Sequence, residues 1–136
     1  MNFSVKASPY TFKVHFVISK DKKEIKAFVQ KHLYELSDED LDKQDAITFY
    51  EDARSPVVCL KSPPKSPKEY GEFYHEVHHA CTLIAGNVGM TSEEIAGETF
   101  AYFIESIVVK ALTKINKLCL TSTSAAPASS SSKNSL

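Results

Sequence analysis

The stretch YGEFYHEVHHACTLIAGNVGM, residues 70–90, decides how the C-terminal half of this chain folds. Its apolar residues recur at three- and four-residue intervals, which is typical of an amphipathic helix. Glycine at 86 and 89 suits a C-terminal cap and the turn after it. We therefore predict a helix from about residue 68 to 85, which begins directly after the proline-rich segment SPPKSP. The expected packing face consists of Tyr70, Phe73, Tyr74, Val77 and Ile84.

A second long helix is expected directly after this turn. Thr91 followed by Glu94 is a capping-box pattern, so Thr91 is the predicted N-cap. Helical spacing continues to about Leu118. Its expected buried side consists of Ile95, Tyr102, Phe103, Ile107, Val108, Leu112 and Ile115.

The N-terminal half combines strands with one further helix. Alternation of apolar residues predicts a strand over 10–19, and helical spacing predicts an amphipathic helix within 20–36. The acidic segment 37–45 is expected to be a surface loop. The segments 46–51 and 56–61 are expected to form a hairpin. The order strand, helix, hairpin, two packed antiparallel helices predicts a small α+β domain over 1–120. The Ser- and Ala-rich tail, 121–136, cannot bury enough apolar surface to order itself and is expected to be disordered.

Composition bounds the classes of function. The chain has 136 residues, 43% of them hydrophobic, and a formal net charge of −1, which fits one soluble domain. That charge gives no electrostatic reason to expect a nucleic acid or an anionic membrane as partner. No signal-peptide core or membrane-spanning run is visible. Three widely spaced cysteines without a CxxC pair favour a reducing, cytoplasmic setting over a disulfide framework.

The first long helix carries a candidate metal site. His75 and His79 stand at i and i+4 on one helix face, so their imidazoles can hold one zinc ion. Glu76 lies about 100° around the helix, where its carboxylate can approach a metal-bound water. This arrangement is the HExxH pattern. A catalytic zinc needs a third protein ligand, and Glu98 is expected at the level of His79 on an antiparallel partner helix. Glu94 is the alternative, although it serves the capping box.

An HExxH helix followed by a helical glutamate resembles the gluzincin class of zinc peptidases. The pair YHEVHHACTLIAG and GETFAYFIESIV more narrowly resembles small zinc-metallopeptidase-like proteins encoded by phages and prophages. The resemblance covers roughly residues 70–110 and rests on the Glu-x-Phe-Ala-Tyr run that begins at Glu98. The wider class often has an aspartate four residues after the ligand glutamate, where this chain has Tyr102. The resemblance implies a Zn²⁺ cofactor, a peptide or protein substrate and the host cytoplasm as the compartment.

Three functions follow as expectations. The first is a zinc-dependent metallopeptidase in which Glu76 is the general base and Tyr102, or else His78, donates to the oxyanion. The strand at 56–61 could then offer an exposed edge to an extended substrate. The second is a zinc-stabilised, non-catalytic binding or regulatory protein on the same scaffold. The third is a metal-free interaction protein with incidental histidines. The sequence leaves the oligomeric state open.

Overall fold

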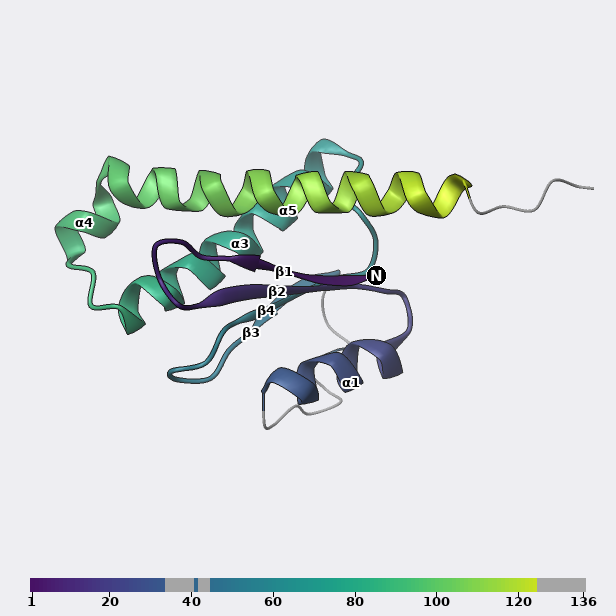
Figure 1. Ribbon diagram of the computed structural model, residues 1–136, viewed down its shortest axis with the longest axis horizontal. Coiled ribbons are helices and arrows are strands. Elements are labelled where there is room, and N and C mark those ends of the chain that lie inside the picture. The colour runs from purple at the N-terminus through teal and green to yellow at the C-terminus, as the bar shows by residue number, and fades with distance from the viewer. Residues whose placement is uncertain (34–40, 42–44, 125–136) are drawn as a thin grey trace, which may run out of the picture.

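The computed structural model describes residues 1–33, 41 and 45–124 (Figure 1). The predicted acidic loop, 37–45, lies almost entirely outside these residues, and 125–136 of the predicted tail lie wholly outside them. The described strands and helices, in chain order, are β1 (Asn2–Lys6), β2 (Lys13–Ile18), α1 (Lys22–His32), β3 (Ala46–Phe49), β4 (Val57–Leu60), α3 (Pro67–Asn87), α4 (Ser92–Ala96) and α5 (Glu98–Ser124). The predicted α+β class is confirmed.

The four strands form one mixed sheet in the order β1-β2-β4-β3. β1 pairs antiparallel with β2, β2 parallel with β4, and β3 antiparallel with β4, so the predicted hairpin is present. The prediction that the strand at 56–61 offers an exposed edge is wrong, because β4 lies between β2 and β3. Among the described strands the edges are β1 and β3, and β3 is the edge strand that α3 contacts.

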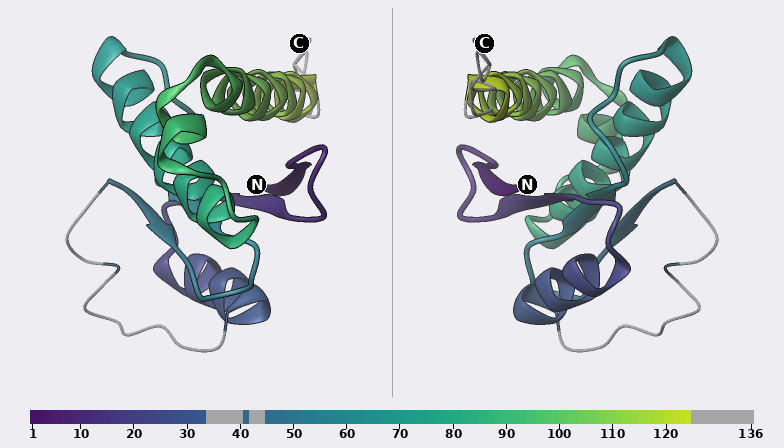
Figure 2. Two further views of the ribbon diagram at one scale, coloured as in Figure 1. Left: turned by 90° about the vertical axis from the view of Figure 1, so that its left-hand side faces the viewer. Right: turned by 90° about the vertical axis from the view of Figure 1, so that its right-hand side faces the viewer.

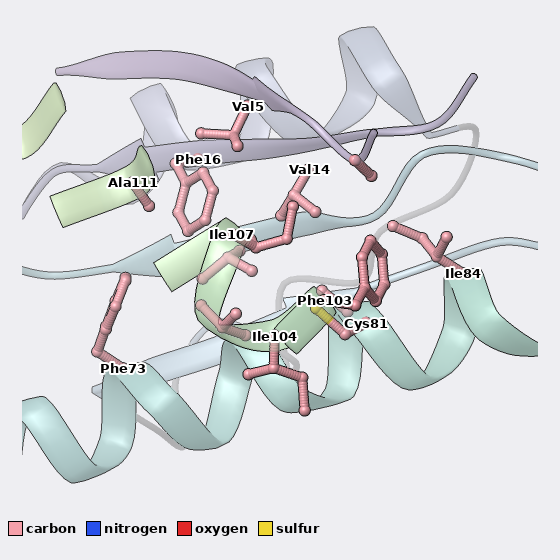
Figure 3. Packing of buried hydrophobic residues seen from close by; sticks show 14 of the residues in the cluster. Val5, Val14, Phe16, Phe73, Cys81, Ile84, Phe103, Ile104, Ile107 and Ala111 are labelled. Carbon is pink, nitrogen blue, oxygen red and sulfur yellow. The ribbon is translucent and has the colours of Figure 1, made fainter. Parts of the chain in front are cut away.

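Helices cover both faces of the sheet. α3 contacts β3, β4 and α5, and α5 contacts β1, whereas α1 contacts β2 and β4 from the opposite face (Figure 2). Between the α3–α5 pair and the sheet lies the larger hydrophobic cluster, in which Phe16, Phe73 and Ile107 pack together (Figure 3). A smaller cluster under α1 contains Val17, Ile25 and Val29. Helix α3 is therefore anchored over the β3–β4 side of the sheet.

The second long helix differs from its prediction in continuity and length. Thr91 caps it with the predicted capping box, but only the short α4 follows, and the chain turns at Gly97 before α5 begins at Glu98. Gly97 has an extended backbone, and a Cβ there would lie 3.3 Å from the carbonyl oxygen of Glu93. At its other end, α5 continues to Ser124, past the predicted start of the tail at 121. The Ser124 hydroxyl donates to the carbonyl oxygen of Thr121, one of the last four carbonyls, which the helix end leaves without an intrahelical N–H donor.

Three tyrosines predicted to pack inward lie on the surface. Tyr70 and Tyr74 on α3 are 45% and 51% exposed, and Tyr102 on α5 is 64% exposed. The inner face of α3 is formed instead by smaller residues together with Phe73, and these fit closely against the strands. Its buried residues are Phe73, Glu76, Val77, Ala80, Cys81, Ile84 and Ala85.

The segment before the predicted first strand is itself a strand. β1 forms because its backbone pairs with β2 over five residue pairs, and because Val5 packs into the larger cluster. Its outer edge is covered by α5, whose Lys110 and Lys114 ammonium groups donate to the carbonyl oxygens of Lys6 and Ser4. A helix that covers an edge strand in this way hinders its pairing with another chain. Within the described residues, no helix could cross a membrane.

Candidate metal centre

The geometry of α3 places His75 and His79 side by side on the surface. His75 lies two positions after the buried Phe73, and His79 lies two positions after the buried Val77. Two positions correspond to about 200° around an α-helix, so both histidines point away from the core. The two Nε2 atoms lie 2.9 Å apart, within hydrogen-bond distance, and the rings meet edge to face with centroids separated by 4.5 Å. Both side chains are exposed. The predicted histidine pair is therefore present and accessible.

Glu76 occupies the inner side of the same helix turn. It is 7% exposed and is the one charged residue that is buried among those the structure describes. The hydroxyl of Thr48, on β3, lies 2.6 Å from its Oε2 atom and 2.9 Å from its backbone carbonyl oxygen. A hydrogen bond to a charged group contributes about 1.5–3 kcal/mol, so this contact ties the helix to the edge strand.

A cleft opens where this helix turn meets the start of β3. It has a volume of about 560 Å³ and brings His75 and Glu76 into one surface hollow. Its wall consists of Asp45, Ala46, Lys68, Gly71, Glu72, His75 and Glu76. A second hollow of about 330 Å³ shares Asp45 and Glu72 with it and continues toward the N-terminus of α3. A ligand in the cleft would therefore lie beside the start of β3, an edge strand of the described sheet.

The residues predicted on the neighbouring helix do not join this pair. Glu98 is the exposed first residue of α5. Tyr102, one turn later, is exposed, and Glu94 serves the cap of α4. Within the described part of the chain, no three His, Cys, Asp or Glu side chains lie close enough together to hold a metal ion. Glu98 as the third ligand, with Glu94 as its alternative, stays a prediction.

His78 faces a different neighbour from the histidine pair. Its ring lies 5.9 Å from the ring of Phe100 on α5, in an edge-to-face arrangement. The ring of His79 is farther away, at 6.4 Å. The α5 side of α3 is thus occupied by His78, whereas His75 and His79 are exposed on its outer face.

A second pair of histidines, His15 on β2 and His32 on α1, carries no sequence signal. Their rings stack with centroids 3.8 Å apart and an interplanar angle of 21°. His15 Nδ1 lies 2.7 Å from the hydroxyl oxygen of Ser4. Burial, and then the neighbouring His32, Lys13 and Lys31, lower the pKa of His15 to about 4. The pKa of His32 is also lowered, by burial and by Lys31. This pair is held neutral and packed.

Thr48 is the site residue that sequence reasoning missed. It stands two positions after the buried Ala46, so strand alternation places it on the face of β3 that meets α3. A hydroxyl on a buried face needs a hydrogen-bond partner, so the sequence alone could have indicated that Thr48 has one. Which residue it meets depends on how α3 packs against the sheet.

The cysteines take no part in the site. All three are free, with Cys59 and Cys81 buried and Cys119 half-buried. Burial raises the pKa of both Cys59 and Cys81 to about 12, and the charge of Glu76 adds to the effect at Cys59. Thiols with such pKa values stay protonated and are poor metal ligands.

Comparison with known proteins gives no match to a family model, a curated protein or a solved structure.

Proposed function

We propose that this protein is a zinc-dependent metallopeptidase in which His75 and His79 bind the metal and Glu76 is the general base. The observation that carries the proposal is the 2.9 Å approach of the Nε2 atoms of these two exposed histidines, one helix turn apart. Glu76 lines the same cleft as His75. On this proposal the partner is a peptide or protein substrate. The compartment is the cytoplasm, that of a host cell if the chain is phage-encoded.

The histidine pair fits a zinc ion closely. Two nitrogens that each lie 2.0–2.1 Å from one tetrahedral ion are separated by about 3.3 Å. The two Nε2 atoms are 2.9 Å apart, so they would have to separate by a few tenths of an ångström to bind the ion. Small changes of the side-chain torsion angles within the same rotamers are enough for this movement. Both rings are exposed, which leaves room for a further protein ligand and a water.

The mechanism follows from the position of Glu76. A zinc ion bound by the two histidines would supply Lewis acidity and lower the pKa of a bound water to about 7. The Glu76 carboxylate lines the same cleft, where it can accept a proton from that water and pass it to the leaving amine. The edge strand β3 borders the cleft, and an extended peptide can align along such an edge through backbone hydrogen bonds.

A non-catalytic zinc-stabilised binding or regulatory protein is the second candidate. The observation that favours it is the burial of Glu76, whose carboxylate already accepts a hydrogen bond from Thr48. A carboxylate that only links α3 to β3 would stabilise the fold without taking part in chemistry.

The Glu76→Gln variant separates the two candidates. It keeps the shape and the acceptor oxygen for Thr48 but removes the base. With zinc bound to both proteins, we expect hydrolysis of a mixed peptide library by the wild type and a loss of about 10²–10⁴-fold in rate for Glu76→Gln. Equal zinc content with no hydrolysis by either protein would instead support the non-catalytic candidate.

A further inference from the structure

The contact between Thr48 and Glu76 places a constraint on the candidate metal centre. Glu76 directly follows His75 in the chain, and a carboxylate is itself a good zinc ligand. A general base must remain beside the metal, where it can reach the water rather than replace it. The site therefore needs a group that holds this carboxylate in place.

Thr48 is that group in the described structure. Its hydroxyl has a single proton to donate, and the nearer acceptor is Glu76 Oε2 at 2.6 Å. The donor comes from a different element, the edge strand β3, so the carboxylate is drawn toward the sheet and away from the outer face of α3. The two histidines lie on that outer face.

We propose that Thr48 is a positioning residue that keeps the Glu76 carboxylate from becoming a ligand of the metal held by His75 and His79. This inference rests on the proposed function. It adds that the edge strand sets the distance between base and metal. A ligand that pairs with β3 would thus meet a carboxylate fixed by the same strand.

The test is a double-mutant cycle in the affinity for Co²⁺, titrated alone into metal-free protein. Thr48→Val removes the hydroxyl with little change of shape and frees the carboxylate to bind the ion, so we expect affinity to rise at least about fivefold. In the Glu76→Gln background the same substitution should change affinity less than about twofold, since an amide is a weaker ligand.

Two further variants serve as controls. Thr48→Ser keeps the hydroxyl and should retain the wild-type affinity. Thr82→Val removes another hydroxyl from α3, one that donates to the carbonyl oxygen of His78, and should leave affinity unchanged. Thermal melts of each metal-free variant check that all of them are folded.

Each outcome bears on one of the two proposals. Wild-type affinity in a folded Thr48→Val protein overturns the positioning role and leaves the proposed function intact. So does an equal change in both backgrounds, because Thr48 would then act independently of Glu76. A wild type that binds no Co²⁺ overturns the proposed function, and the positioning role with it.

Discussion

His75 and His79 lie exposed on α3 with their Nε2 atoms 2.9 Å apart, whereas His15 and His32 lie half-buried between β2 and α1 with their rings stacked. In the first pair, nitrogen faces nitrogen. In the second pair, ring faces ring, and one nitrogen of His15 already has the Ser4 hydroxyl as its partner. A metal ion needs lone pairs that converge on one point, so only the first geometry suits it.

The difference shows that the surroundings of a histidine determine its pKa and its suitability for binding a metal ion. Burial disfavours the charged imidazolium, and His15 accordingly has a pKa lowered to about 4. The exposed pair on α3 stays open to ions and substrates. We therefore propose metal binding for the α3 pair and a packing role for the β2–α1 pair, and variants of each pair test this proposal.

The largest expected effect is stabilisation of the fold by zinc. A ligand that binds only the native state at about 100 times its Kd raises the free energy of unfolding by about 2.7 kcal/mol. Urea unfolding with and without zinc should show this increase in wild type and lose it in His79→Ala. The matched control is His78→Ala, because His78 faces Phe100 and should keep the full increase. Equal stabilisation of His79→Ala would contradict the assignment.

The next largest effect is acid sensitivity from the second pair. The folded-state pKa of His15, about 4, lies below its unfolded value of 6.5, so the unfolded chain binds the proton more tightly. Stability is therefore complete above about pH 6.5 and falls as the pH drops toward 4. Screening at this half-exposed ring reduces the loss to about 1–2 kcal/mol.

Urea unfolding at pH 7 and 4.5, with a chelator present, measures this loss. His15→Gln retains a side chain that can partner Ser4 but does not titrate in this range, so its stability should fall less with acid than that of wild type. If both proteins lose stability in parallel, the loss has another source.

The smallest effect concerns the coupling within the stacked pair. Truncating His32 in His32→Ala exposes His15 and removes a neighbouring positive charge at low pH, and both changes should raise the pKa of His15 from about 4 toward 6.5. An NMR titration of the His15 ring follows this change directly. Lys31→Ala is the control, since it removes a charge and keeps the ring contact. A pKa that stays near 4 in His32→Ala would show that the stack does not shield His15.

Local geometry accounts for what the sequence could predict. The i, i+4 spacing of His75 and His79 determines their proximity once a helix forms. Two short strand-like segments, 46–51 and 56–61, joined by a short loop are enough to predict a hairpin. The capping box at Thr91 and the left-handed turn at Gly89, which follows the end of α3 at Asn87, likewise act within one or two turns, whereas Gly86 lies inside the helix.

What sequence could not supply is the relative placement of elements. The position of Glu98 along an antiparallel helix could be matched to that of His79, but the angle of the histidines around α3, where they point away from the core, could not be predicted. Glu98 as a ligand stays a prediction. The prediction of one continuous helix was wrong, because the chain turns at Gly97. Tyr74 fits an apolar face by spacing and yet lies on the surface, because smaller residues fill the space against β3 and β4.

Binding of zinc by His75 and His79 together is tested by the zinc content of purified protein after dialysis against metal-free buffer. We expect one equivalent per chain in wild type and in His15→Gln/His32→Gln, and none in His75→Ala/His79→Ala. Zinc retained equally by the His75→Ala/His79→Ala protein, or absent from wild type even after zinc is supplied, would contradict it.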